Sequence, residues 1–494
     1  MRLAVIAFVV GAAATAGATT YPVGSTRTYH SPCDLVKMVT LQPGDIIEVD
    51  AGTYTDACQL TASGTAQSPI IMRGVAGPRP VFDATGVDLS GSGSVPRAIF
   101  QWTNGSYWQV SHLELTKAAN ASNNGSGFRL TAGAHDVTFD DMSIHDNQDG
   151  AQSDGVSVIT ISNSDIYANG ANDGQSHNLY LQGDTVRLIG NHIHDSHGGQ
   201  NIKLRTRYIE IINNYVENAG NYEVDLIQSA NTAMPNANAV LIGNVFLRAT
   251  SADNNSQTIL FGTDNATDPV GSRNGALYAI NNTFILRNAS NQLFHVLTTT
   301  PAPAPTHVYL YNNIVFATVA GTHLTSDATT AAFVTGSNNF IMDGITGVPA
   351  ALTATTGGTS AGFTASDDYH LAAGSPAIDI GLPNPSYADG NGAMQNGAPG
   401  GQPTPPIGSE TRYVVGAAPD LGAFEYGNMP SGGGSDWVGD SGTGSGSKSG
   451  GGCCEVGGGN PATAWIGVSL VAAGLRRRRQ SRRHAVGAAD QEPL

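Results

Sequence analysis

An alternating apolar pattern recurs along the middle of the chain. Each copy has an apolar-alternating stretch, then Gly or Asn, an Asn, any residue and a closing apolar residue. The closing residues of successive copies lie about 22 to 38 positions apart, a spacing typical of one coil per repeat with loop insertions. The pattern therefore predicts a solenoid. Clear copies span 186–193, 209–216, 239–246, 277–284 and 308–315, and looser copies span 137–144 and 159–166.

Inside each copy the apolar residues have a period of two, as in a strand with one buried face. Val186, Leu188, Ile209 and Ile211 are expected to point inward. One Asn recurs at a fixed offset, where a turn residue can adopt a left-handed conformation and stack its amide on the next coil. We interpret these asparagines as structural, because they do not change from coil to coil. They are Asn191, Asn214, Asn244, Asn282 and Asn313.

A solenoid needs caps, because its end coils otherwise expose their apolar interior. The segment 33–39, with Ser31 as its N-cap candidate, predicts a short amphipathic helix at the entrance. Other segments resemble the opening and closing coils of pectate-lyase-like β-helix repeat proteins of uncertain activity. This resemblance covers most of 26–426 and implies an all-β fold, a right-handed parallel β-helix with a short N-terminal capping helix. The segments are 41–45, 51–54, 69–71, 369–371, 374–379 and 420–425.

The first residues have the order of an export signal. Arg2 supplies the positive start, residues 3–14 an apolar run and residues 16–18 a small-residue cleavage pattern. Because the exported compartment is oxidising, Cys33 and Cys58 are candidates for one disulfide across the N-terminal cap. Two free buried thiols are the alternative.

The C-terminus carries a second targeting pattern. A Gly/Ser tether is followed by Cys453 and Cys454, an apolar stretch over 461–475 and an Arg cluster. That stretch is shorter than the roughly 17 to 25 residues of a spanning helix, so it suits a processing signal. The order resembles the myxobacterial C-terminal sorting signal. This resemblance implies a cut by a sorting protease and anchoring at the outer membrane through lipid on a Cys, so we expect a cell-surface or secreted protein.

These features divide the chain into consecutive segments. The expected segments are 1–18 (signal peptide), 19–60 (N-terminal cap), 61–345 (parallel β-helix), 346–426 (closing segment), 427–452 (Gly/Ser linker), 453–483 (sorting tail) and 484–494 (trailing residues).

Composition narrows the range of partners. Only 13% of the 494 residues are charged and 62 are Gly, which suits an all-β scaffold with many tight turns. The formal net charge of −16 disfavours nucleic acid, whose backbone requires a basic face. An anionic polysaccharide remains compatible where local Lys, Arg or a bound cation overcomes the repulsion. We expect a monomer.

Three central stretches, 177–181, 201–205 and 222–226, concentrate polar residues. If their leucines, isoleucine and valine face the core, alternation places the polar neighbours together outside. Because neighbouring coils are about 4.8 Å apart, Tyr180, Lys203 and Asp225 should form a row. The residues expected outside are Asn178, Tyr180, Asn201, Lys203, Arg205, Glu223 and Asp225.

These stretches are similar to a group of β-helix proteins with His-Asn-Leu-Tyr, Lys-x-Arg and Tyr-Glu-x-Asp strands. Polysaccharide lyases on this fold use a Lys or Arg on such a strand to remove the proton beside a uronate carboxylate. The 4-linked sugar is then eliminated, which requires a cation on the carboxylate, a base and a proton source. The resemblance implies Lys203 as base, Arg205 as carboxylate clamp and His177 or Tyr180 as acid. The candidate substrate-binding residues are Asn178, Asn201, Tyr222, Glu223 and Asp225.

Lys203 also has a structural interpretation, as one member of an outward salt-bridge ladder with Glu223 and Asp225. A catalytic Lys needs a lowered pKa, which Arg205 favours and the two acids oppose. We prefer the functional interpretation because such an acid, base and aromatic cluster is unusual in so charge-poor a chain.

Two groups of residues are candidate metal ligands. Calcium prefers six to eight oxygens, and three Asp residues close in sequence could contribute, although flanking glycines indicate ordinary turns. Three His residues could bind zinc, but no carboxylate has a matching spacing, so loop histidines are the favoured interpretation. Calcium is thus the one cofactor candidate. The groups are Asp146, Asp149 and Asp154, and His192, His194 and His197.

Three functions compete. The first is a lyase acting on a uronate-containing polysaccharide by β-elimination. The second is a non-catalytic glycan-binding or adhesion protein, for which a long surface solenoid is also suitable. The third is a polygalacturonase-type hydrolase, which needs paired carboxylates. That family's Asn-Thr-Asp and Gly-Asp-Asp strands are absent from this sequence.

Overall fold

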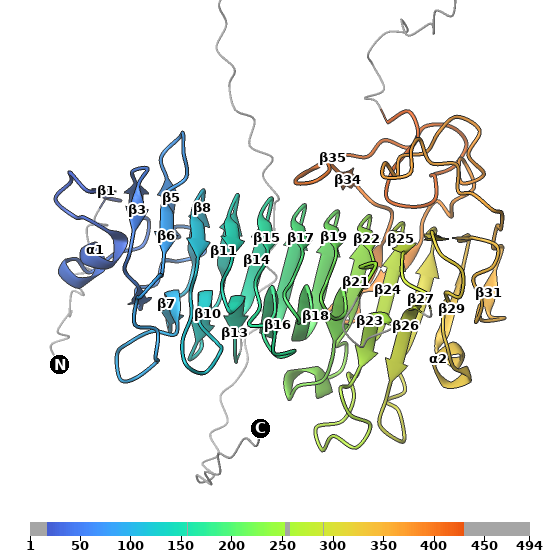
Figure 1. The fold of residues 1–494 in the computed structure, drawn as a ribbon, viewed down its shortest axis with the longest axis horizontal. Coiled ribbons are helices and arrows are strands. Elements are labelled where there is room, and N and C mark those ends of the chain that lie inside the picture. Colours follow the sequence, from blue (N-terminus) through green and yellow to red (C-terminus); the bar gives the residue numbers. More distant parts are fainter. Residues whose placement is uncertain (1–16, 156, 252–256, 290, 429–494) are drawn as a thin grey trace, which may run out of the picture. The chain divides into compact units, whose positions relative to one another are not determined.

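Short parallel strands stack coil upon coil along the described part of the chain (Figure 1). The computed structural model describes residues 17–155, 157–251, 257–289 and 291–428. These residues form the predicted right-handed parallel β-helix. Most of the expected signal peptide, almost all of the Gly/Ser linker and the tail with Cys453 and Cys454 lie outside the described residues.

Each coil contributes strands to three faces. The first face contains β4 (Cys58–Leu60), β7 (Ala98–Thr103), β10 (Ser126–Thr131), β13 (Asp149–Ser153), the first halves of β16 (Leu179–Ile189) and β18 (Ile202–Ile212), β20 (Val224–Leu226), β23 (Gln257–Gly262) and β26 (Gln292–Leu297). The second face contains β1 (Thr20–Val23), β2 (Ile46–Val49), β5 (Ile70–Gly74), β8 (Trp108–Ser111), β11 (Val137–Asp140), β14 (Val158–Ser162), the second halves of β16 and β18, β21 (Ala239–Ile242), β24 (Ala276–Ile280), β27 (His307–Tyr311), β29 (Val334–Ser337) and β31 (Leu352–Thr353).

The third face is a separate 11-stranded sheet. It contains β3 (Thr53–Tyr54), β6 (Val81–Asp83), β9 (Glu114–Thr116), β12 (Ser143–His145), β15 (Asp165–Tyr167), β17 (His192–His194), β19 (Tyr215–Glu217), β22 (Val245–Leu247), β25 (Thr283–Leu286), β28 (Ile314–Ala317) and β30 (Phe340–Ile341). The first and second faces join through β16 and β18, which continue around the corner between them. At that corner Gly183 has a φ of +146°, and a Cβ there would meet the Ser157 carbonyl oxygen at 2.4 Å.

The interior consists of rows of apolar side chains that repeat from coil to coil. Leu181 pairs in register with Leu204, and Leu204 with Leu226, and all three are fully buried. This row confirms the inward positions predicted from the period of two. Each row removes apolar surface from water, and similar side chains of successive coils pack against one another, which stabilises the stack.

Asparagine amides form a second kind of row at the corner before the third face. Asn214 donates from Nδ2 to the Leu188 carbonyl at 2.8 Å and to the next ladder amide, Asn244 Oδ1, at 3.0 Å. These bonds satisfy backbone carbonyls that the turn would otherwise leave buried and unpaired. The structural interpretation of this ladder is confirmed, but the left-handed conformation belongs to the residue before each ladder amide, such as Asn213 with a φ of +55°.

A further amide ladder contradicts part of the sequence analysis. Asn178, Asn201 and Glu223, expected outside as substrate-binding residues, are fully buried. Asn178 donates to Asn201 Oδ1 at 2.8 Å, and Asn201 donates to Glu223 Oε2 at 2.8 Å. Each residue lies at the bend just before its strand, where the two-residue alternation does not yet apply. Their side chains therefore turn inward and hold the corner.

Both helices found among the described residues are short. Helix α1 (Pro32–Met38) begins at the predicted N-cap, where Ser31 Oγ accepts from Asp34 N at 3.0 Å. Its Cys33 forms the predicted disulfide with Cys58 on β4. The second helix is α2 (Ala328–Ala332), and a 3-10 turn, η1, spans Asn231–Ala233. Among the described residues, no helix has the length and apolar character needed to cross a membrane.

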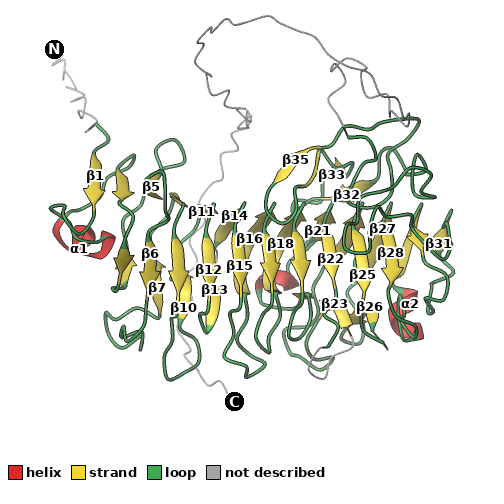
Figure 2. Ribbon diagram, turned by 45° about the horizontal axis from the view of Figure 1, so that its top comes forward, coloured by secondary structure: helices red, strands yellow, loops and turns green. Residues whose placement is uncertain are grey.

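The closing segment after β31 first bonds to the last coil, where Thr356 forms a bridge to Phe340. It folds back along the outside and forms two antiparallel hairpins, β32 (Ser386–Ala388) with β33 (Met394–Asn396) and β34 (Gly401–Pro403) with β35 (Ser409–Thr411) (Figures 1 and 2). Its backbone meets coils far apart in sequence, from the Gly190 carbonyl to the Asn338 amide. It thereby covers outward apolar residues of the second and third faces, such as Tyr278 and Leu247.

The stacked interior predicts a large cost for an inward charge. Leu204→Asp should lower the free energy of unfolding by several kcal/mol, because the carboxylate would be buried without a partner. Gln109→Asp introduces the same group on an exposed outward position of β8 and should change it by less than about 0.5 kcal/mol. Chemical denaturation of both variants checks this, and equal stability of the two would contradict the assigned register.

Candidate functional site

A row of polar side chains crosses the first face. Tyr180 on β16 pairs in register with Lys203 on β18, and Lys203 pairs with Asp225 on β20. The row predicted from the sequence is therefore confirmed in its register. It continues toward the N-terminal coils through Gln152 and Arg129, which are hydrogen-bonded to each other. One strand-to-strand line thus carries an aromatic hydroxyl, two cations and a carboxylate.

Lys203 is held between two carboxylates. Its Nζ lies 3.2 Å from Asp225 Oδ2 and 3.8 Å from Asp264 Oδ2, and 14% of its side chain is exposed. Burial lowers the pKa of Lys203, but Asp225 and Asp264 outweigh this effect and raise it above its usual value. The ammonium form therefore predominates at neutral pH. The lowered pKa that a lysine base requires at neutral pH is not present.

Arg205 lies two residues further along the same outward side of β18. Its Nη2 is 2.5 Å from Asp264 Oδ2, and its Nη1 donates to the Gln228 carbonyl at 2.7 Å. Burial lowers the pKa of Arg205, while Tyr180 and Asp264 raise it and prevail. Tyr180 also lies beside the cations, with Lys203 Nζ 6.0 Å from the centroid of its ring, so the phenol and both cations form one group.

Asp225 is fully buried although it belongs to the outward row. Its Oδ2 faces Lys203 and accepts from Gln200 Nε2 at 3.2 Å. Within the described residues its Oδ1 has no hydrogen-bond partner. Burial raises the pKa of Asp225 to about 6 against the opposing effect of Lys203. This carboxyl group therefore changes its charge close to neutral pH.

Asp264 is the member of the site that sequence reasoning missed. It follows β23 in a loop, and it reaches Arg205 from 59 positions away. Its backbone N–H is fixed by Gln228 Oε1 at 2.8 Å. No alternation or motif in the sequence identifies Asp264 as a site residue. It lies in a loop insertion, and the length of a loop does not determine which of its side chains contact the sheet. A third of its side chain is exposed.

The two remaining predicted site residues differ in accessibility. His177 is 2% exposed, and its Nδ1 accepts a hydrogen bond from Gln200 N at 3.1 Å. Burial lowers the pKa of His177 well below its usual value. A sugar cannot reach this buried ring, so the predicted role of His177 as the acid is wrong. Tyr222 is partly exposed, just before the bend at Glu223.

The candidate calcium ligands do not come together. Asp149 is buried and accepts from His177 N and from Gln152 Nε2, while Asp146 pairs with His145 on the third face. Asp154 lies in the turn after β13. In the described ranges these three carboxylates form no group that could hold one ion. They therefore do not fit calcium, and no step of the chemistry is assigned to it.

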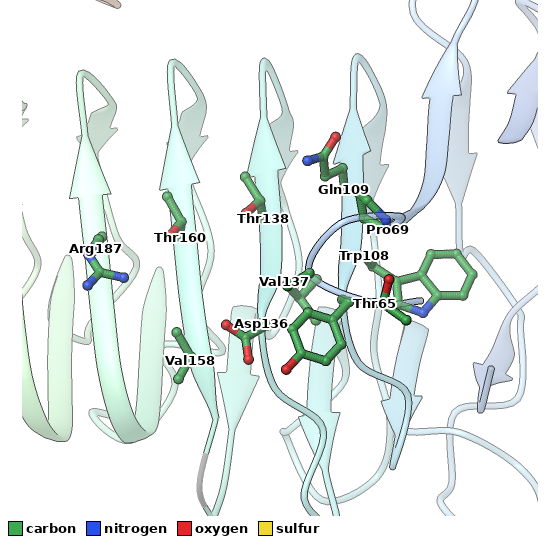
Figure 3. Close-up of a pocket in the computed structure, with 12 residues that line it drawn as sticks. Thr65, Pro69, Trp108, Gln109, Asp136, Val137, Thr138, Val158, Thr160 and Arg187 are labelled. Carbon is green, nitrogen blue, oxygen red and sulfur yellow. The ribbon is translucent and has the colours of Figure 1, made fainter. Parts of the chain in front are cut away.

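A separate cavity of about 220 Å³ lies on the second face (Figure 3). Its walls carry the hydroxyls of Thr65, Thr138 and Thr160, together with the charged side chains of Asp136 and Arg187. Arg187 Nε lies 2.7 Å from Oε2 of Glu210, a residue that does not line the cavity. The cavity is suited to a small polar group but lacks the connected acid, cation and phenol of the first face.

No family model and no curated protein matches this sequence. Among solved structures, the chain is similar to pectate lyase Pel9A, with 17% identity, 83% of this chain and 97% of that chain covered and a TM-score of 0.46. An alginate lyase from Paenibacillus sp. str. FPU-7 is 20% identical, with 62% and 96% covered and a TM-score of 0.44. A rhamnogalacturonan lyase is 14% identical, with 65% and 87% covered and a TM-score of 0.44.

Proposed function

We propose that this protein acts on a uronate-containing polysaccharide at the first face, by β-elimination. One observation carries the proposal. The Asp264 carboxylate lies beside both Lys203 and Arg205, 3.8 Å and 2.5 Å from their nearest nitrogens. A pair of cations that binds a carboxylate from a partly exposed loop offers the same charge and geometry to the carboxylate of a uronate.

Elimination assigns a different task to each member of the row. Lys203 and Arg205 both start as cations. When Arg205 binds the uronate carboxylate, its positive charge stabilises the negative charge that develops on the neighbouring carbon as the proton leaves. Lys203, once deprotonated, takes the proton from the carbon next to the carboxylate. The bond to the 4-linked oxygen then breaks, and Tyr180 supplies a proton to the leaving oxygen. Because Asp225 raises the pKa of Lys203, this chemistry belongs to alkaline pH.

The polar row also suits a chain-like ligand. It runs from Arg129 through Gln152, Tyr180 and Lys203 to Asp225, across successive coils. With about 4.8 Å between coils, the row extends over about 19 Å along the solenoid. A stretch of several sugar units could therefore lie across the strands, with one carboxylate at the cation pair.

Glycan binding without turnover is the second candidate. The raised pKa of Lys203 favours it, because a protonated lysine binds a carboxylate but removes no proton. Both candidates agree with a protein exported by residues 1–18 and held at the outer membrane through its Cys453 and Cys454 tail, which we also propose. The two candidates differ only in chemistry after binding.

The activity test uses purified protein and uronate polymers, with and without calcium and after chelation. Ultraviolet absorbance from an unsaturated product is expected. Lys203→Ala and Arg205→Ala should each reduce kcat/KM by at least about a hundredfold, while Arg187→Ala, a cation on the second face, should leave it unchanged. Binding without any product would support the second candidate, and new reducing ends without absorbance would indicate hydrolysis.

The role of Lys203 as a base has its own test. Lys203→Arg keeps the positive charge but cannot lose its proton at any working pH, so binding should persist while turnover is lost. In the wild type, kcat/KM should rise about tenfold per pH unit above neutral, because deprotonation of a raised-pKa lysine limits the rate. A profile that instead rises near pH 6, where the buried Asp225 titrates, and then stays flat would contradict Lys203 as the base.

The position of Asp264 predicts competition with substrate. Asp264→Asn should tighten binding of uronate oligomers by up to about fivefold, the equivalent of an exposed ion pair of about 1 kcal/mol. Asp184→Asn is the matched control. It removes a carboxylate that pairs with Arg207, which lies on β18 as Lys203 and Arg205 do. Calorimetric titration checks both variants. Weaker binding by Asp264→Asn would show that Asp264 orients the cations and does not occupy the substrate position.

A further inference from the structure

Two histidines and a carboxylate meet on the third face, away from the polar row of the first face. His192 and His194 lie on β17, with Ile193 between them pointing inward, so both rings project outward. Strands β15 and β17 are neighbours in the sheet of the third face (Figure 1), and Asp165 on β15 is the register partner of His192. The expectation that these were loop histidines is wrong for His192 and His194. His197 does lie in the following loop and is exposed.

The three potential ligand atoms are close together. Asp165 Oδ1 lies 3.3 Å from His192 Nδ1 and 3.2 Å from His194 Nε2. All three atoms lie within 4.8 Å of one another. In the described part of the chain, no other set of three or more His, Cys, Asp or Glu residues places its ligand atoms this close together. Tetrahedral coordination with bonds of about 2.0 Å separates ligand atoms by about 3.3 Å. The spacing to the carboxylate therefore matches a shared ion.

The outer nitrogen of each ring also has a carboxylate partner. His192 Nε2 lies 3.2 Å from Glu217 Oε1, and His194 Nδ1 lies 2.6 Å from Asp195 Oδ2. Carboxylates in this position fix the orientation of metal-bound imidazoles and increase their basicity. Simple ion pairing would use one carboxylate per histidine, whereas here Asp165 is an additional carboxylate that His192 Nδ1 and His194 Nε2 share.

We propose that Asp165, His192 and His194 bind one divalent transition-metal ion, with Zn²⁺ as the expected occupant. Two imidazole nitrogens and one carboxylate oxygen suit zinc, whereas Ca²⁺ and Mg²⁺ prefer oxygen ligands throughout. Asp165 is 32% exposed and the two rings are 13% and 15% exposed, so a fourth position opens to solvent. Three protein ligands with an open position can also hold a water molecule or a ligand atom.

Binding requires one local adjustment. The two imidazole rings are stacked, with centroids 3.8 Å apart and planes 20° apart, so their lone pairs run nearly side by side. His194 Nε2 already meets Asp165 Oδ1 with hydrogen-bond geometry, so a rotation about χ2, which is a broad torsion in histidine, is needed to direct the nitrogens of both rings at one shared ion. Tyr167 stacks on His194 from the neighbouring strand, which limits this rotation to a small angle. The proposed metal site is independent of the proposed uronate site, because it uses no residue of the polar row.

The test is a calorimetric titration of the full chain with Zn²⁺, after alkylation of the thiols of Cys453 and Cys454. One equivalent should bind. His194→Ala and Asp165→Asn should each weaken binding by at least about tenfold, and Glu217→Gln should weaken it by about tenfold as the loss of an outer partner. His197→Ala is the matched control and should bind like the wild type.

A second measurement covers variants that fold poorly. Co²⁺ added to the wild-type protein should give the visible absorbance of a tetrahedral nitrogen and oxygen site, and one equivalent of Zn²⁺ should abolish it. Thermal melting confirms that Asp165→Asn, which keeps the side-chain shape, is folded. The proposal is overturned if no Zn²⁺ binds, if Ca²⁺ binds equally well, or if His197→Ala weakens binding as much as His194→Ala does.

Discussion

Each side chain in a parallel β-helix must tolerate the side chain at the same position about 4.8 Å away in the next coil. Inside, this constraint selects rows of similar apolar residues, such as Leu181, Leu204 and Leu226. At the corners it selects amides, because an Asn can both donate to and accept from its neighbour in the row. Outside, water relaxes the constraint. Chemistry can therefore vary on the outward rows without disturbing the stack.

The candidate site shows how this constraint limits charge. Lys203 and Asp225 are register partners from neighbouring strands, and burial of both makes each depend on the other. A buried ion pair is costly to desolvate, and the loss of one partner leaves an uncompensated charge. Asp264 and Arg205 extend the pair into a partly exposed network. The contacts of Lys203 with Asp225 and Asp264 also raise the pKa of Lys203, so they set the protonation state from which any catalysis by Lys203 must start.

The sequence predicted those parts of the structure that depend on strand periodicity. The Tyr180 to Asp225 register and the inward leucines follow from a strict period of two. The disulfide followed from the presence of two cysteines in the body of a chain whose first residues have the order of an export signal. Prediction failed where the backbone bends, as at Asn201 and Glu223, because the bend turns an expected outward residue inward. It also failed for Asp264, since no local pattern encodes where a loop returns.

The returning segment has a consequence for how the solenoid unfolds. A simple repeat array has contacts between nearest neighbours alone, so its stability resembles a one-dimensional chain that frays from either end. Here one continuous strap bonds to the Gly190 carbonyl, to Arg207 and to Asn281, which belong to different coils. Opening the last coil would not release its neighbours until the strap also detaches. The C-terminal half should thus behave as one cooperative unit, a foldon larger than a single repeat.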